Sequence, residues 1–120
     1  MSQVTVSKSV EFRQGAIELL ILKTLHWGPQ HGFSIARWIQ DTTDDVLCLE
    51  EGSLYPTLHR LEDKGWVQAK WGTSENNRRA KFYELTTVGR TQLASETRDW
   101  RKYANAIAKV LSATAKPTVA

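Results

Sequence analysis

Hydrophobic residues recur along this chain at two spacings, and these spacings predict the order of its elements. Residues 14–27 (QGAIELLILKTLHW) are apolar on nearly every side, which predicts a buried helix that stops at Gly28. Residues 32–41 (GFSIARWIQD) predict a shorter amphipathic helix that ends near Thr42. Residues 46–50 alternate between leucine and other side chains, a pattern typical of a short strand.

The segment at 51–64 (EGSLYPTLHRLEDK) predicts a helix with one apolar stripe. Three leucines fall within about 60° of one another on a helical wheel and should face the core. Pro56 is compatible with a helix only near its N-terminus, so the helix should begin at about residues 51–53. Gly65 is a natural left-handed stop at the other end. The leucines of the stripe are Leu54, Leu58 and Leu61.

The rest of the chain predicts a hairpin and one long helix. Residues 66–71 (WVQAKW) and 81–85 (KFYEL) are strand-like and flank a polar, turn-rich segment, so they should pair as a β-hairpin. Thr86 or Thr87 can cap a helix over residues 88–111. The whole order is mainly α with a small β-hairpin wing (α+β), which indicates a winged helix-turn-helix followed by a C-terminal helix. The predicted units are a winged-helix domain (13–86), a C-terminal helix packed with the first helix (87–112) and flexible ends (1–12 and 113–120).

Charge is distributed unevenly between the two parts of the 120-residue chain. The net charge of +3 and the sequence pI of about 9.2 point only weakly to an anionic partner by themselves. Residues 1–72 hold seven Lys/Arg and nine Asp/Glu, whereas residues 73–120 hold nine Lys/Arg and four Asp/Glu. The positive charge therefore belongs to the C-terminal part, which contains the predicted hairpin tip and the last helix.

Cysteine and apolar content indicate where the protein works. The single cysteine, Cys48, excludes an internal disulfide and fits a reducing cytoplasm. The first ten residues have no apolar run that could serve as a signal peptide, and no stretch approaches the ~20 apolar residues of a membrane span. We therefore expect a cytoplasmic protein without a membrane partner. We expect no metal and no cofactor either, because the histidines lie on different predicted elements and Cys48 has no partner at ligand spacing.

The face of the helix at 51–64 opposite the leucines has chemistry suited to reading DNA. The major groove is about 12 Å wide and admits one helix, and hydroxyl, imidazole and guanidinium groups can donate to phosphates or base edges. Acidic residues at both ends of this helix repel phosphate, so an ordinary surface helix is an equally good interpretation of this segment alone. The candidate DNA contacts are Ser53, Tyr55, Pro56, His59 and Arg60.

The predicted hairpin tip supplies the positive charge that this helix lacks. Cations and amides on an exposed turn can clamp phosphates, and the tip contains only one acidic residue, Glu75. A solvated loop is the alternative interpretation, but the tip follows the candidate helix at the distance typical of a winged helix. The candidate contacts here are Asn77, Arg78, Arg79 and Lys81.

The last helix carries a heptad pattern. Six residues recur at spacings of 4, 3, 4, 3 and 4, which is an a/d seam sustained for almost three heptads. A second copy of the helix is the simplest partner for such a seam, so we expect a homodimer in which 87–112 is the dimerisation helix and the first helix shares the interface. Packing back on the same domain is the alternative. The seam consists of Leu93, Thr97, Trp100, Ala104, Ile107 and Leu111.

These segments together resemble a known family. The run GSLYPTLHRLEDKGWV, then W, then NNRRAKFYELTTVGRTQL is similar to the PadR family of bacterial transcriptional regulators. The run LLILKTLHWGPQHGFSIARWI looks like the opening of that family. The resemblance covers residues 14–111, and the single C-terminal helix looks like the small-protein branch of the family.

The resemblance implies a homodimeric winged-helix repressor that binds double-stranded DNA at a palindromic operator. It implies that the helix at 51–64 reads DNA, that the cations of the hairpin serve as the wing, and that the last helix dimerises. Family members are commonly released from DNA by small, often aromatic, molecules, so an effector is expected. Trp100 would meet its symmetry mate near the two-fold axis, where we favour plain interface packing over stacking on a flat ligand.

Two other classes of function compete with this one. A winged helix can serve as a protein-interaction module without DNA binding, and the acidic residues within 41–51 would then meet a basic partner. An enzyme is the weaker alternative, because the sequence has no Gly-rich phosphate loop and no nucleophile elbow.

Overall fold

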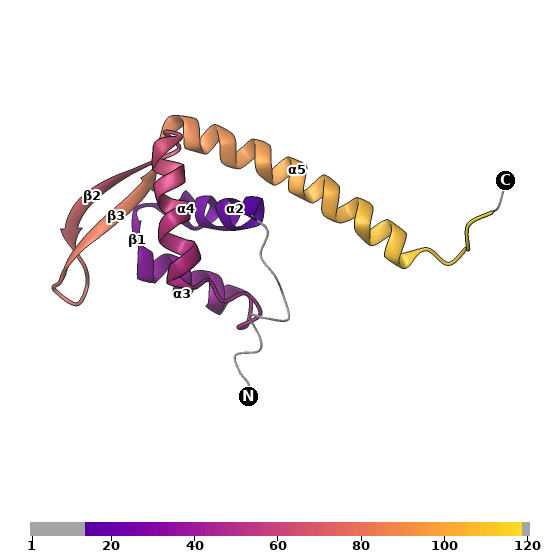
Figure 1. Ribbon diagram of the computed structural model, residues 1–120, viewed down its shortest axis with the longest axis horizontal. Coiled ribbons are helices and arrows are strands. Elements are labelled where there is room, and N and C mark those ends of the chain that lie inside the picture. The colour runs from indigo at the N-terminus through magenta and orange to yellow at the C-terminus, as the bar shows by residue number, and fades with distance from the viewer. Residues whose placement is uncertain (1–13, 119–120) are drawn as a thin grey trace.

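The computed structural model describes residues 14–118, so the predicted flexible segment 1–12 lies outside the described residues. Three helices and a hairpin gather at one end of the molecule, and the last helix extends away from them (Figure 1). The strands form one antiparallel sheet in the order β1–β3–β2. The elements are α2 (Gln14–Thr24), the 3-10 helix η1 (Leu25–Trp27), β1 (Gln30–His31), α3 (Gly32–Thr42), α4 (Glu51–Asp63), β2 (Val67–Thr73), β3 (Arg79–Leu85) and α5 (Thr87–Ser112).

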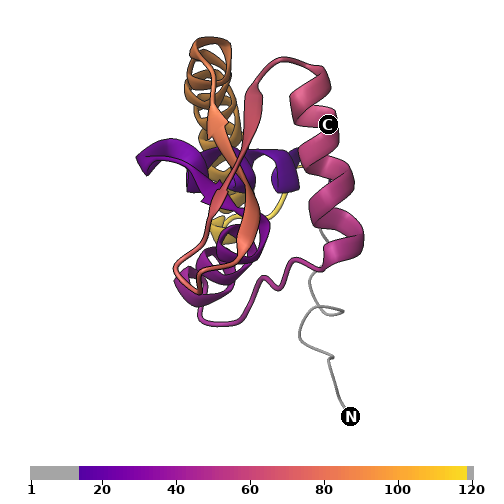
Figure 2. The same cartoon turned by 90° about the vertical axis from the view of Figure 1, so that its left-hand side faces the viewer.

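The predicted helices and hairpin are confirmed, and the fold is α+β with the arrangement of a winged helix. The helix α3 ends at Thr42, as the sequence predicts. The hairpin is longer than predicted because the ladder continues to the pair Thr73 and Arg79, which brings the second wing arginine into a strand. Figure 2 shows this hairpin in front, with α4 beside it and α5 behind it.

The strand predicted at residues 46–50 is wrong, and the third strand lies elsewhere. Asp44 and Asp45 both have positive φ, so the chain after α3 turns back on itself. The Leu47 N–H donates to the Thr43 hydroxyl at 3.1 Å, which uses a backbone donor that a sheet would need. Leu47 and Leu49 alternate with polar or exposed residues because both leucines pack against the core beneath this loop. The strand β1, two residues long, pairs with β3 instead.

The core lies where α2, α3 and α4 meet the sheet. The predicted leucine stripe of α4 is confirmed, since all three leucines are at most 2% exposed. The helix α2 is buried on more than one side, as its nearly continuous apolar sequence requires. The largest fully buried side chains include Ile21, Leu22, Leu25, Ile35, Ile39, Leu54, Leu58, Leu61 and Tyr83.

The start and end of α4 follow the predicted signals, with one difference. The helix begins at Glu51, so Pro56 is its sixth residue and lies beyond the first turn. Proline has no N–H, so the Gly52 carbonyl lacks the usual helical donor four residues on. At the other end, Gly65 has φ +78, and the Trp66 N–H closes the helix on the Leu61 carbonyl at 3.0 Å.

A tight junction joins the end of α4 to the start of α5. The Thr86 hydroxyl accepts from the Gly89 N–H at 3.0 Å and donates to the Gly65 carbonyl at 2.6 Å. The Thr86 N–H donates to the Trp66 carbonyl at 3.0 Å. A Cβ at Gly89 would collide with that carbonyl oxygen, so only glycine allows this approach. The direction of α5 is therefore fixed relative to α4.

The helix α5 is long but mostly solvent-exposed. It has 26 residues, of which the first turns pack on α2 and the sheet. No helix within residues 14–118 is both long enough and apolar enough to cross a bilayer.

Candidate nucleic-acid interface

A short chain of hydrogen bonds along α4 orients Arg60. The Thr57 hydroxyl donates to the Ser53 carbonyl at 2.6 Å, and Arg60 Nη2 donates to the Thr57 hydroxyl oxygen at 2.9 Å. Thr57 is fully buried, whereas Arg60 and His59 are exposed. Thr57 therefore fixes the guanidinium along the helix and leaves further N–H groups of Arg60 for an outside acceptor.

Tyr55 and Pro56 lie on the exposed N-terminal half of α4. A Cβ added at Gly32 would lie 2.5 Å from the Tyr55 hydroxyl oxygen, so the tyrosine ring packs against the start of α3. Tyr55 is nevertheless 37% exposed. The ring thus connects the two helices while its edge remains open to a partner.

The hairpin tip is a compact turn that fixes the wing residues. The Ser74 N–H donates to the Arg78 carbonyl at 2.8 Å, and the Asn77 N–H donates to the Ser74 carbonyl at 2.9 Å. Asn77 has φ +57, a left-handed conformation that asparagine tolerates well. Arg78 is exposed, whereas the Arg79 guanidinium lies over the Trp71 ring, 4.7 Å from its centroid.

Lys81 is held differently from the other predicted wing cations. Its Nζ lies 3.7 Å from Glu62 Oε1 on α4 and 5.6 Å from the centroid of the Tyr83 ring. Burial, followed by the nearby Glu62 carboxylate, raises the pKa of the Tyr83 hydroxyl above its ordinary value. Lys81 therefore connects the wing to α4, and it is less available to a phosphate than Arg78.

A groove of about 520 Å³ separates the wing from α3 and α4. The structure brings Tyr55, Arg78, Arg79 and Lys81 together around it. The other predicted contacts on α4 do not line the groove; they include Ser53, His59 and Arg60. Two aromatic residues that line this groove, Trp71 and Phe33, are not among the contacts predicted from the sequence, and they are 61% and 68% exposed. The hairpin register could have identified Trp71, because it pairs with Lys81 and so shares its face.

The seam residues of α5 divide into a covered part and an open part. Leu93 is 7% exposed, and the Thr97 hydroxyl donates to the Leu93 carbonyl at 2.6 Å. Ala104 is half-buried. Trp100, Ile107 and Leu111 are 42%, 41% and 80% exposed. Packing on its own domain therefore covers only the start of the seam.

A charged cluster connects α2, α4 and α5. Lys64 Nζ, just after α4, lies 3.1 Å from both carboxylate oxygens of Glu18 on α2, and Glu18 is only 7% exposed. The same Nζ lies 4.4 Å from the centroid of the Trp66 ring. Burial, and next the Glu18 carboxylate, raises the pKa of Glu96 on α5 above its ordinary value.

No three His, Cys, Asp or Glu side chains within residues 14–118 come together as a metal site. Cys48 is half-buried, and its Sγ lies 3.4 Å from the Asp45 carbonyl oxygen to which it donates.

Comparisons with known proteins agree with this architecture. The chain is 32% identical over 89 residues to the transcriptional regulator Rv3488 of Mycobacterium tuberculosis, covering 73% of this chain and 78% of the relative. The crystal structure of smu.1704 from Streptococcus mutans matches with a TM-score of 0.78 and 26% identity, over 91% of this chain and 98% of that chain. A PadR family transcription regulator from Clostridium difficile matches with a TM-score of 0.70 and 26% identity, over 80% and 98% of the two chains.

The family model named Transcriptional regulator PadR-like family matches residues 21–95, which run from the middle of α2 to the first turns of α5. That match spans the core, the candidate groove and the junction between α4 and α5. The chain therefore belongs to the PadR-like family of transcriptional regulators.

Proposed function

We propose that this chain is a homodimeric, sequence-specific DNA-binding protein, a repressor that a small molecule releases from a palindromic operator. The groove between α4 and the wing carries the proposal, because Arg78, Arg79 and Lys81 line it beside the exposed half of α4. In this arrangement α4 enters the major groove and the wing tip contacts the neighbouring phosphates. A protein that acts on chromosomal DNA is expected in the cytoplasm.

The proposed dimer rests on the open part of the α5 seam. Trp100, Ile107 and Leu111 are apolar side chains at heptad spacing with large exposed areas. A second copy of α5 covers them and makes a two-fold axis. Each protomer then presents one α4 and one wing, so the operator should contain two half-sites separated by about one helical turn or a multiple of it.

The proposed effector site is the cleft between α2 and α5, of about 690 Å³. Its apolar side is made by Leu19, Leu20, Leu93 and Trp100. Its cations are Lys23, Arg90, Arg98 and Arg101. Apolar walls with surrounding cations suit an aromatic acid, and an occupant beside Trp100 would change the angle between the two α5 helices. Saturating 1-naphthoate should weaken the DNA complex, and Trp100→Leu should remove that response.

Salt dependence of DNA binding tests the central proposal. If each protomer neutralises three to five phosphates, the slope of log K against log salt is about −5 to −9 for the dimer. Duplexes selected by the purified protein from a random pool provide the ligand for this titration. Failure to shift any duplex at low salt would favour the protein-interaction alternative, whose partner would face the exposed acidic residues Asp41, Asp44, Asp45, Glu50 and Glu51.

The wing assignment has its own test in the double variant Arg78→Ala and Arg79→Ala. Four phosphate contacts are lost per dimer, so the salt slope should become shallower by about 3 to 4, and affinity should fall for all sequences alike. The matched control is Lys102→Ala with Lys109→Ala, which removes the same charge from the exposed surface of α5. An unchanged slope in the wing variant, or an equal change in the control, would show that the wing does not contact phosphate.

A further inference from the structure

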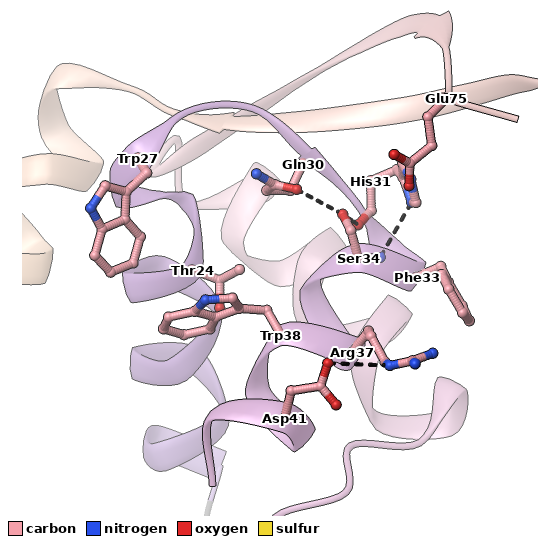
Figure 3. Close-up of a pocket in the computed structure, with 10 residues that line it drawn as sticks. All are labelled: Thr24, Trp27, Gln30, His31, Phe33, Ser34, Arg37, Trp38, Asp41 and Glu75. Carbon is pink, nitrogen blue, oxygen red and sulfur yellow. Dashed lines mark hydrogen bonds and ion pairs between the residues drawn. The ribbon is translucent and has the colours of Figure 1, made fainter. Parts of the chain in front are cut away.

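A separate cleft of about 610 Å³ lies at the start of α3, within the size range of small-molecule pockets. Its walls come from η1, β1, α3 and the wing tip (Figure 3). Figure 3 shows two tryptophans on one side of it, Trp27 and Trp38, and Glu75 of the wing on the other side, next to His31. The α2–α5 cleft and the groove beside α4 do not include these tryptophans.

An exposed and a half-buried tryptophan ring form the apolar part of this cleft. The rings of Trp27 and Trp38 lie 5.4 Å apart between centroids, with 55° between their planes. Trp27 is 63% exposed, and the Lys23 ammonium lies 4.7 Å from the centroid of its ring. Trp27 therefore already binds one cation of the chain through its π-system, and tryptophan is the strongest aromatic residue for such contacts.

The charge of this cleft is opposite to that of the other two. Its charged side chains are Arg37, Asp41 and Glu75, so carboxylates outnumber cations. Cations outnumber carboxylates in the groove beside α4 and in the α2–α5 cleft. His31 also lines this cleft, and its Nδ1 accepts the Ser34 N–H at 3.3 Å and caps α3.

Both carboxylates are available to a ligand. The Arg37 Nε lies 3.3 Å from Asp41 Oδ2, but the two side chains are 63% and 62% exposed, and such a pair is weak. Glu75 forms no ion pair with any residue of the described range 14–118. A ligand cation can therefore replace Arg37 at Asp41 and give Glu75 a partner.

We propose that this cleft binds a flat organic cation, an aromatic ring system with a quaternary nitrogen. The ring system stacks on the exposed ring of Trp27 with its edge against Trp38, and its positive charge faces Asp41 and Glu75. Glu75 belongs to the same turn as Arg78, so the bound cation holds the wing tip against α3.

Calorimetric titration of the free protein tests this site without DNA, so its outcome is independent of the proposed DNA binding. The probe is 1-methylquinolinium, and 1-methylnaphthalene has the same shape without the charge. We expect the cation to bind about tenfold more tightly than the neutral compound. Trp27→Leu should lower the affinity for the cation about tenfold. Trp71→Leu, which removes a tryptophan of similar exposure from the neighbouring groove, should leave it unchanged.

The carboxylates provide the second part of the test. Asp41→Asn and Glu75→Gln should each lower the affinity for 1-methylquinolinium about threefold and leave the affinity for 1-methylnaphthalene unchanged. Equal binding of the two compounds would overturn the proposal. Equal losses in Trp27→Leu and Trp71→Leu, or no binding to the wild-type protein at millimolar concentration, would also overturn it. Thermal melting of each variant confirms that it is folded, which is expected because all four side chains are largely exposed.

Discussion

The two ends of α5 differ in how their side chains are used. At its N-terminal end, Thr86 and Gly89 join the helix to the end of α4 through hydrogen bonds of 2.6 to 3.0 Å and a contact that only glycine permits. At its C-terminal end, Ile107 and Leu111 remain 41% and 80% exposed. The first end is complete within a single protomer, and the second is the surface that the proposed dimer would cover.

This difference assigns the two ends to different tasks. The junction sets the direction of α5 relative to α4, and therefore the angle at which any partner of α5 holds the second α4. In the proposed dimer, the open end would contact the partner. A change in α5 packing would then change the distance between the two α4 helices directly, because the junction has no freedom to absorb it.

The largest effect is expected at the open end, from Ile107→Glu. If two copies of Ile107 are buried in the dimer, replacing both with a charge removes about 3–6 kcal/mol, which is a hundredfold or more in the dissociation constant. Sedimentation velocity across a concentration series measures this shift. Val110→Glu is the matched control, because Val110 is 75% exposed on the same helix but lies off the seam. Equal behaviour of the two variants would mean that the seam is not the interface.

The junction and the open end were not equally predictable from the sequence. The heptad spacing of 93–111 is visible in the sequence, because apolar residues at that spacing are typical of a helix that packs against another helix. The helix caps and the leucine stripe of α4 were predictable for the same reason, since each depends on neighbours along the chain. The contact between Gly89 and the Trp66 carbonyl was not, because it joins residues that lie on different elements.

The same distinction explains one wrong prediction and one omission elsewhere in the molecule. The alternation at 46–50 is a real pattern, but two consecutive left-handed aspartates turn the chain, and packing of the loop on the core produces it. In the candidate interface, the charged tip of the wing was predictable from composition. The ion pair that holds Lys81 to Glu62 was not, because it depends on how close the hairpin lies to α4.

The junction itself is tested by Gly89→Ala, the second largest expected effect. The added Cβ would meet the Trp66 backbone oxygen, which cannot move without breaking its bond to the Thr86 N–H. We expect a loss of about 3 kcal/mol in the free energy of unfolding, measured by urea denaturation. Gly15→Ala is the control, because a Cβ there meets nothing within 4 Å. It should stabilise the protein by up to about 1 kcal/mol, since alanine favours a helix. A neutral Gly89→Ala would show that α5 can shift, and the direct coupling described above would then fail.

The smallest effect concerns the charged cluster beside the junction, and its sign depends on pH. Burial, then the carboxylate of Glu18, raises the pKa of Glu96 above its ordinary value of 4.5, so ionised Glu96 disfavours the folded state. Its favourable contribution is complete below the unfolded pKa and is lost as pH rises through the folded one. Glu96→Gln should therefore be more stable than the wild type at pH 7, and the difference should shrink below about pH 4.5.

Glu84 on β3 provides the matched case with the opposite sign. A hydrogen bond from Gln68, and next Lys70, lowers the pKa of Glu84, so its contribution is present above the unfolded pKa and is lost as pH falls. Glu84→Gln should thus gain nothing at pH 7, whereas Glu96→Gln gains stability there. Urea denaturation of both variants between about pH 3.5 and pH 7.5 separates the two signs, because this interval includes the ordinary pKa of a glutamate side chain. If both variants respond to pH in the same direction, α5 does not bury Glu96 against α2, and the closed end of α5 is looser than its hydrogen bonds indicate.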